Sequence, residues 1–386
     1  MSQSRLYQSA RCHREEAAAQ LPPIRPGEMD SPEGYLASED LKAAVEVALT
    51  LGMPLLLTGE PGLGKSVLAG SLALELFDAE PLEFVVKSDT QYTDLFYHFD
   101  TVGRFHAASA APGKDGRPHD AADPRRFLEF NGLGRAILHA MAPEHIQHRL
   151  GPAWEALAHP GRPTRSVVLI DEIDKAPRDV PNDILTQIDR MQFRIPEISA
   201  HPDVGSDLFA VPDDDKVDHL RPIVVITSNS EKALPDPFLR RCVYHHIRMP
   251  PYRAANKAQS RDGDSGHGGG LGHHGDVSVE AIVEARLGAR YKGQGEAMVA
   301  EAIDLFAYLR EQPLERIPSL AELLNWLQFL LPDGRMGAAS LPRLADMDPA
   351  RLRTSVTLTL LKKERDQLNV DELLKGWLKA QEPAKA

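Results

Sequence analysis

The stretch Gly59-Glu60-Pro61-Gly62-Leu63-Gly64-Lys65-Ser66 decides the fold of this 386-residue chain. It has the spacing G-x-x-x-x-G-K-S, follows an apolar run at 54–58 and opens a helical segment at 65–77. Its glycines permit a tight turn in which backbone N–H groups converge on phosphate oxygens at a helix N-terminus. The sequence therefore predicts a phosphate-binding loop for a nucleotide, most simply ATP, with contacts from Gly59 through Val67.

Two side chains of this loop have defined expectations. Lys65 is expected to reach the β- and γ-phosphates, and the hydroxyl of Ser66 is expected to ligate Mg²⁺. A glycine-rich turn without any ligand is the alternative. The strand before the motif and the helix after it favour the nucleotide-binding interpretation.

A second element, Val167-Val168-Leu169-Ile170-Asp171-Glu172, carries two carboxylates at the end of an apolar strand, as a Walker B element does. Asp171 is expected to hold the metal ion through water, and Glu172 to orient or deprotonate the water that attacks the γ-phosphate. Paired acidic residues after a strand often form only a solvated turn. Downstream of a phosphate-binding loop, they indicate nucleotide hydrolysis.

Two later motifs extend the candidate site. Asn229 ends the segment Thr227-Ser228-Asn229, where it can hydrogen-bond the γ-phosphate or the attacking water, although Ser-Asn pairs commonly cap turns. Arg240 and Arg241 follow shortly, and a guanidinium can stabilise charge on a transferring phosphoryl group, sometimes from a neighbouring subunit. Adjacent arginines are usually only surface residues. The functional interpretation of this pair therefore depends on the motifs that precede it.

Short apolar runs alternate with helical stretches in the first two thirds of the chain, which predicts a doubly wound parallel sheet covered on both faces. The predicted strands are 54–58, 83–87, 167–170, 222–227 and 243–247. A helix is predicted at 38–51 with Ser38 as its N-cap, and another at 131–141. Further helices are predicted at 278–290, 296–311, 319–331, 349–365 and 370–381, the third of them opened by a capping box at Ser319.

These patterns predict four parts. They are a flexible arm at 1–30, an α/β nucleotide-binding domain at 31–252, a Gly- and His-rich linker at 253–277, and a helical lid domain at 278–386. The α/β domain is interrupted by inserts at about 99–140 and 193–220. The second insert is long enough for a hairpin or flap.

Composition limits the partners. There are 44 basic and 56 acidic residues, a formal charge of -12, which disfavours non-specific binding to nucleic acid. Two cysteines, Cys12 and Cys242, form no disulfide framework. The polar N-terminus and the short apolar runs predict a cytoplasmic protein without a membrane segment.

The order of these elements resembles the AAA+ superfamily and, within it, the MoxR-type ATPases. The resemblance covers about 30–252 well and the helical remainder loosely. The resemblance rests on four segments, Leu57 to Ser66, Leu169 to Ala176, Ile226 to Asn229 and Leu239 to Arg241. It implies that Asn229 is sensor 1, that Arg240 or Arg241 is an arginine finger acting on the next subunit, and that the active state is a ring of six subunits. Arg241 aligns slightly better with the family's finger position.

The chain departs from the family pattern at sensor 2. MoxR-type ATPases often have Ser-Pro-Arg at the start of a lid helix, whereas this chain has Arg316-Ile317-Pro318-Ser319-Leu320. Arg316 is nearby but out of register.

The resemblance also implies a chaperone-like role. MoxR-type relatives remodel or mature a partner protein, frequently one with a von Willebrand A domain. The alternative is an NTPase subunit of a nucleic-acid-directed or anti-phage system, with GTP as a possible nucleotide and a basic stripe formed by Arg104, Arg125, Arg126 and Arg135. A third interpretation, an assembly that senses nucleotide with negligible hydrolysis, is disfavoured by Glu172 and Asn229.

Overall fold

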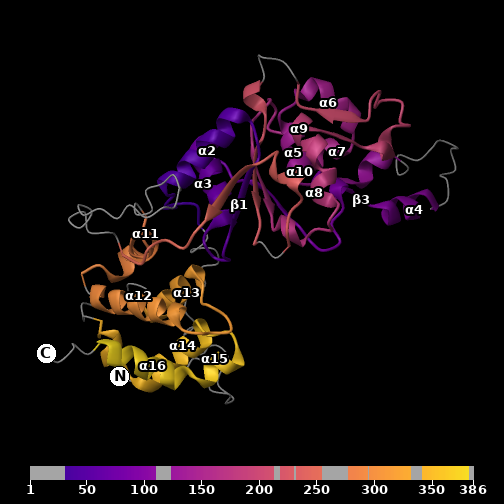
Figure 1. Cartoon of the computed structure of the whole chain (residues 1–386). Coiled ribbons are helices and arrows are strands. Elements are labelled where there is room, and N and C mark those ends of the chain that lie inside the picture. Colours follow the sequence, from indigo (N-terminus) through magenta and orange to yellow (C-terminus); the bar gives the residue numbers. More distant parts are fainter. Residues whose placement is uncertain are drawn as a thin grey trace, which may run out of the picture.

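A five-stranded parallel sheet lies at the centre of the computed structural model, which describes residues 31–109, 123–212, 218–229, 232–253, 277–293, 295–331 and 341–381 (Figure 1). Its strand order is β2-β5-β8-β1-β9, with every neighbouring pair parallel. The strands are β1 (Leu55–Gly59), β2 (Leu82–Val85), β5 (Val167–Asp171), β8 (Ile223–Thr227) and β9 (Val243–Ile247). The predicted α/β fold class is confirmed.

Helices cover both faces of this sheet. Because successive side chains of a strand point to opposite faces, Val167 and Leu169 pack on one side, and Val168 and Ile170 on the other. The first face is covered by α2 (Glu39–Leu51) and α3 (Lys65–Phe77), and the second by α5 (Gly132–His139), α8 (Val180–Asp183) and α9 (Leu185–Arg190). Ser38 caps α2 as predicted, since its hydroxyl accepts a hydrogen bond from the N–H of Leu41.

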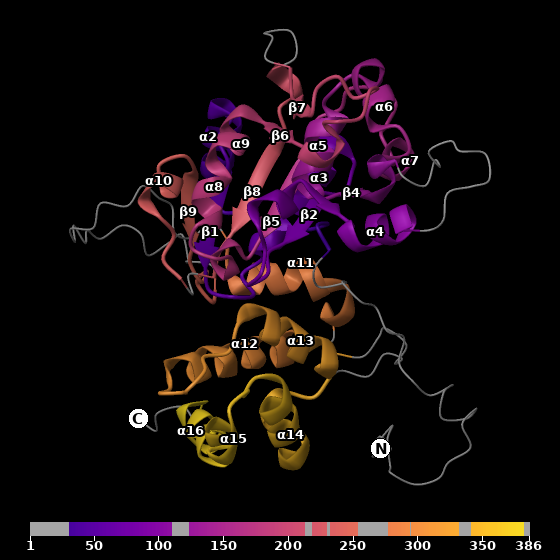
Figure 2. The same ribbon diagram turned by 90° about the vertical axis from the view of Figure 1, so that its right-hand side faces the viewer.

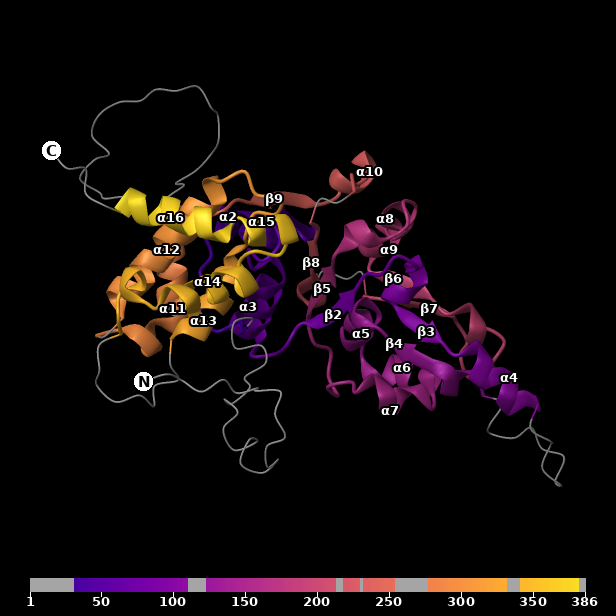
Figure 3. The same cartoon turned by 90° about the horizontal axis from the view of Figure 1, so that it is seen from below.

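Each expected insert contains a two-stranded antiparallel hairpin. The first pairs β3 (Tyr97–Phe99) with β4 (Leu128–Phe130), and the second pairs β6 (Gln192–Arg194) with β7 (Leu208–Ala210). An aromatic stack joins them, because the ring of Phe193 lies 5.2 Å from that of Phe96 and 5.7 Å from that of Phe209. Phe96 and Tyr97 are therefore core residues, whereas α4 (Thr101–Ser109) projects on the side away from the C-terminal helices (Figures 1 and 3).

Shorter elements complete the α/β region. They are η1 (Tyr92–Leu95), η3 (Pro124–Phe127), α6 (Pro143–Leu150), α7 (Ala153–Leu157), η4 (Ile173–Lys175), η5 (Pro196–Ile198), η6 (Asp218–Leu220) and α10 (Asp236–Leu239).

The C-terminal region is helical (Figure 2) and has its own hydrophobic core. Its elements are α11 (Val279–Tyr291), α12 (Glu296–Glu311), α13 (Leu320–Leu330), η7 (Leu344–Asp346), α14 (Pro349–Thr359), α15 (Glu364–Leu368) and α16 (Val370–Gln381). Trp326 and Trp377 are fully buried in this core, and Leu63 of the phosphate loop packs against it. The predicted capping box is present, because Ser319 and Glu322 exchange hydrogen bonds at the start of α13.

One predicted helix is divided. The expected single helix at 349–365 ends at Thr359, and a separate helix begins at Glu364. Leu360 and Leu361 are buried at the break, and the side-chain amide of Gln367 donates to the carbonyls of Thr357 and Leu361. This side chain satisfies carbonyls that would otherwise be left without partners at the end of α14.

The predicted arm at 1–30 and nearly all of the linker at 253–277 lie outside the described residues, so the domain boundaries remain a prediction. Within the described residues, no helix combines the length and the apolar character that crossing a membrane requires.

The substitution Gly134→Ala tests the close packing of α5 against the backbone of Phe96. A Cβ atom there would lie 2.0 Å from the backbone oxygen of Phe96, so the backbone must shift. We expect the free energy of unfolding to fall by about 1–3 kcal/mol, measured by denaturant titration. Gly288→Ala in α11 is the matched control. Its Cβ would meet only side-chain atoms at 3.5 Å or more, so stability should hold or rise by up to about 1 kcal/mol. A stable Gly134→Ala protein would contradict the packing.

Candidate functional site

The phosphate-binding loop connects β1 to α3 and depends on glycine at the end of β1. Gly59 has φ 138°, and a Cβ atom there would lie 2.3 Å from the carbonyl oxygen of Ile247 in β9. Gly62 and Gly64 also have positive φ, and Gly64 is the N-cap of α3. The loop therefore turns directly from a buried strand into a helix N-terminus, as the sequence predicts.

Lys65 is buried at the first position of α3. Its Nζ donates hydrogen bonds to the carbonyls of Gly59 and Glu60, both at 2.9 Å. Burial lowers the pKa of Lys65, while the negative charges of Asp171 and neighbouring acidic residues oppose that shift. The ammonium group is thus held inside the loop and beside the carboxylates of β5.

The two predicted metal-binding residues contact each other. The hydroxyl of Ser66 donates to Oδ1 of Asp171 at 2.8 Å. A hydroxyl and a carboxylate are hard oxygen donors of the type that Mg²⁺ uses, together with water and phosphate oxygens. The donor set therefore fits the predicted Mg²⁺, with Ser66 and Asp171 as the residues that would hold it.

Thr227, at the end of β8, is a component that the sequence analysis did not single out. Its hydroxyl donates to Oδ1 of Asp171 and accepts a hydrogen bond from the N–H of Glu172 at 3.0 Å. It therefore orients both acidic residues from the neighbouring strand. A threonine at the end of a buried strand was the available signal, but its partners are 55 and 56 positions away.

Glu172 is held by two side chains. Oε1 accepts from Nδ2 of Asn229 at 3.3 Å, and Oε2 forms an ion pair with Lys175. The backbone of Glu172 is left-handed with φ 60°, which is uncommon for a residue other than glycine and costs about 1–3 kcal/mol. Asn229 is positioned in turn by Asp174, whose carboxylate accepts from its backbone N–H at 3.2 Å. The predicted acid and sensor side chains are thus adjacent.

Two cavities meet at the phosphate loop. A cleft of about 1180 Å³ is lined by the loop and by Asp171, Glu172, Thr227 and Asn229. A second cavity of about 700 Å³ shares Gly62, Gly64 and Val67 with that cleft. Its remaining walls include the segment around Tyr35, β9, α11 and the start of α13. The described residues therefore offer two adjoining spaces at one loop, a cleft that contains the candidate catalytic side chains and a more apolar cavity.

The two candidate finger arginines lie outside the described lining of this cleft. Arg241 forms an ion pair with Asp189 at 3.1 Å and donates to the carbonyl of Pro237. Arg240 is exposed. Both follow α10, beyond the end of β8, so neither is brought to the nucleotide cleft of its own chain.

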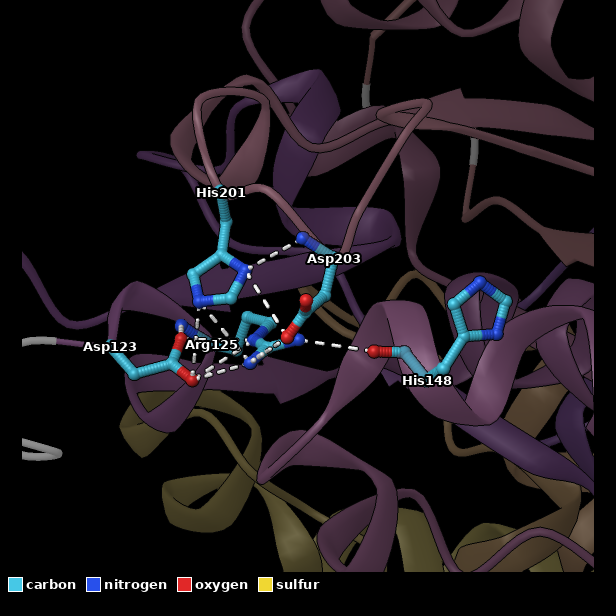
Figure 4. A network of polar contacts seen from close by, with 5 residues as sticks. All are labelled: Asp123, Arg125, His148, His201 and Asp203. Carbon is cyan, nitrogen blue, oxygen red and sulfur yellow. Dashed lines mark hydrogen bonds and ion pairs between the residues drawn. The ribbon is translucent and has the colours of Figure 1, made fainter.

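The proposed basic stripe does not form. Arg125 is buried, and its guanidinium binds Asp123 at 2.7 Å, the carbonyl of His148 at 3.1 Å and Asp203 at 3.7 Å, with His201 alongside (Figure 4). Although burial alone would raise it, hydrogen bonds from Arg125 keep the pKa of Asp123 below its usual value. This network ties the first insert to the loop between β6 and β7, which is a structural role.

Arg135 also departs from the stripe. It lines the phosphate cleft, and its buried Nε has no hydrogen-bond partner among the described residues. Arg135 therefore belongs to the phosphate cleft and not to the basic stripe in which the sequence analysis placed it.

Comparison with known proteins agrees with this geometry. Residues 54–242 match the family model of the AAA domain, dynein-related subfamily. This match and the five-stranded parallel sheet agree with an α/β P-loop AAA+ fold, which implies nucleotide binding.

Two solved structures are similar at low sequence identity. A closed state of Hsp104 with ATPγS and FITC-casein has 15% identity and a TM-score of 0.35, over 78% of this chain and 44% of that chain. A proposed ATPase from Cytophaga hutchinsonii has 12% identity and a TM-score of 0.31, over 91% of this chain and 92% of that chain. The chain thus spans less than half of the Hsp104 chain. No curated protein is similar enough to count as a match.

The substitution Thr227→Val tests the link between β5 and β8. It removes a donor to Asp171 and an acceptor for the N–H of Glu172 at nearly constant volume. We expect the free energy of unfolding to fall by about 1–3 kcal/mol, measured by denaturant titration, because buried polar groups lose their partners. Thr227→Ser keeps the hydroxyl and should retain most of that stability. Equal stability of the valine and serine variants would contradict the role of the hydroxyl.

Proposed function

We propose that this protein hydrolyses ATP in the presence of Mg²⁺ and uses the energy, as a ring, to remodel a partner protein. The observation that carries the proposal is the convergence of Lys65, Ser66, Asp171, Glu172 and Asn229 on one cleft from three neighbouring strands. Nucleotide binding alone requires the loop. The additional acid and amide side chains support hydrolysis.

Each side chain has a defined role in this mechanism. On binding, the Nζ of Lys65 exchanges backbone carbonyls for β- and γ-phosphate oxygens, and the N–H groups of the loop donate to the same phosphates. Mg²⁺ held by Ser66 and Asp171 would neutralise charge on the phosphate oxygens. Glu172 accepts the proton of the attacking water, and Asn229 orients that water or the γ-phosphate.

The second cavity supports a nucleoside as the rest of the ligand. Its mainly apolar walls fit a base, and its volume of about 700 Å³ is within the usual range for small-molecule sites. Asp40 and Asn325 add polar groups to the lining. We propose ATP as the nucleotide. Displacement of a bound fluorescent nucleotide by ATP and by GTP, measured separately, decides which of the two binds more tightly.

We propose that the active state is a ring, of six subunits in MoxR-type relatives, with an arginine supplied to the neighbouring site. Both arginines are exposed, but the guanidinium of Arg241 is paired with Asp189 of its own chain, whereas that of Arg240 has no ion pair among the described residues. The guanidinium without an ion pair is the one more available to a neighbour, so we favour Arg240 over Arg241. This preference differs from the one that alignment with the family suggests.

A MoxR-type role as a chaperone for a protein client, such as one with a von Willebrand A domain, is the biological proposal. It is supported by the acidic net charge of -12 and by the burial of Arg125, which removes a central member of the basic stripe required by the nucleic-acid alternative. A pull-down from the native host tests it, with a Glu172→Gln variant loaded with ATP as bait and the ADP-loaded protein as control. Recovery of nucleic acid without any ATP-dependent protein would contradict the proposal.

Lys65→Ala and Glu172→Gln separate binding from hydrolysis. Loss of the Lys65 charge should weaken ATP binding about 10- to 100-fold, because a hydrogen bond to a charged group is lost. Glu172→Gln should bind ATP normally while its kcat falls about 10²- to 10⁴-fold, because the proton acceptor is removed. Fluorescent-nucleotide titration and steady-state phosphate release measure the two effects. Unchanged kcat in Glu172→Gln would remove Glu172 from the mechanism.

Mixing experiments test the arginine supplied in trans. Arg240→Ala should bind ATP but lose about 10³-fold or more in kcat, whereas Arg241→Ala should lose much less. An equimolar mixture of Arg240→Ala and Lys65→Ala subunits should regain about a quarter of the wild-type rate, since an intact loop meets an intact arginine at that fraction of ring interfaces. A mixture as inactive as its components, or a more severe effect of Arg241→Ala, would contradict the assignment.

A further inference from the structure

Arg310, near the C-terminal end of α12, connects the helical region to the phosphate-binding loop. Its Nη2 forms an ion pair with Oε2 of Glu60 at 2.8 Å, and its Nη1 donates to the carbonyl of Pro318 at 2.5 Å. The guanidinium lies 5.7 Å from the centre of the Phe306 ring. The Arg310 side chain is only 9% exposed, whereas that of Glu60 is 52% exposed. Arg310 is therefore a largely covered cation with contacts in two separate segments.

Both segments continue into residues that line the apolar cavity. Glu60 precedes, with Pro61 between them, the loop residues Gly62, Leu63 and Gly64, which form one wall. Pro318 leads into α13, whose residues Leu320, Ala321, Leu324 and Asn325 line the other. The walls touch at Gly62, where an added Cβ would lie 3.0 Å from Cβ of Ala321 and 3.2 Å from Ser319. Arg310 thus bridges two of the elements that line this space.

Arg316, the lid arginine considered from the sequence, does not make this connection. It pairs with Glu322 in the first turn of α13 at 3.3 Å, and its side chain is half exposed. The start of α13, Ser319-Leu320-Ala321-Glu322, contains no arginine. The contact with the loop comes instead from the preceding helix.

We propose that Arg310 is a positioning residue that holds α13 against the phosphate loop, at the separation that admits a nucleoside base. The inference rests on the proposed nucleotide function and names the residue that sets its base-binding cavity. Glu60 is not among the described residues that line the phosphate cleft. The contribution of Arg310 is therefore the same for a diphosphate and a triphosphate, and it affects affinity and not kcat at saturation.

A double-mutant cycle on the full chain tests this role. ADP binding is measured directly, and ATP binding is measured in the Glu172→Gln background, for Arg310→Met, Glu60→Gln and the double variant. Each variant that lacks Arg310 should raise Kd about 3- to 10-fold for both nucleotides, because the clamp is lost. The double variant should be no weaker than Arg310→Met. Glu60→Gln is measured both with Arg310 present and with Arg310 replaced by Met. Any direct effect of the Glu60 charge on the phosphates is the same in both measurements and cancels from the interaction free energy.

Arg353→Met is the matched control. It breaks a comparable pair with Asp371 in the same helical region, at 2.8 Å, and both partners are exposed. Its Kd values should equal those of wild type, and the thermal midpoints of the two arginine variants without nucleotide show whether folding is affected. Should Arg310→Met fail to fold, Arg310→Lys keeps the charge but lacks the planar guanidinium whose two separate nitrogens contact Glu60 and Pro318, and it takes the same place in the cycle.

Three results would overturn the proposal. They are an unchanged Kd in Arg310→Met, additive effects of the two substitutions, and a larger loss for ATP than for ADP, which would make Arg310 a phosphate contact. Failure of the wild-type protein to bind either nucleotide would instead overturn the proposed function.

Discussion

The carboxylate of Asp171 is the group on which the arrangement of the cleft depends. It accepts hydrogen bonds from Ser66 at the start of α3 and from Thr227 at the end of β8, so three consecutive strands of the sheet are tied at their carboxyl ends. Ligands of open α/β sheets bind at this edge, because the loops that follow the strands converge there. An acceptor-only carboxylate suits the position, since both neighbours present hydroxyl donors.

The strain at Glu172 follows from the same arrangement. Its N–H is bound to Thr227 and its carboxylate to Asn229 and Lys175, which together hold a left-handed backbone that the residue would otherwise avoid. Strained residues persist where surrounding contacts over-determine them, and they concentrate at functional sites. The geometry of Glu172 is therefore consistent with its proposed role in activating water. The neighbouring hydrogen bonds offset the free-energy cost of its left-handed backbone.

The phosphate loop also contacts both the parallel sheet and the hydrophobic core of the helical region. Gly59 approaches β9 more closely than any side chain would allow, whereas Leu63, four residues later, packs into the core of the helical region. Glu60 is held between them by Arg310. A change in the position of the helical region therefore acts directly on the loop. This coupling gives the proposed hydrolysis cycle a route to movement of the whole C-terminal region.

The inserts are stabilised differently from the sheet. Their hairpins contain short strands and depend on the stack of Phe96, Phe193 and Phe209, and on the buried guanidinium of Arg125. Both are contacts between segments far apart in the chain. Arg125, which the basic stripe would need at the surface, thus serves instead to hold the two inserts together.

The sequence by itself determined the strand-helix order, the phosphate loop and the carboxylates of β5, because these follow from local spacing: glycines before a helix, and apolar runs of strand length. It also placed α3, α12 and α16 at their observed bounds. Tertiary structure alone decided the role of Thr227, the burial of Arg125, the break between α14 and α15, and the pairing of Arg310 with Glu60 across 250 positions. Each of those depends on which distant group satisfies a polar atom, and local patterns carry no information about that partner.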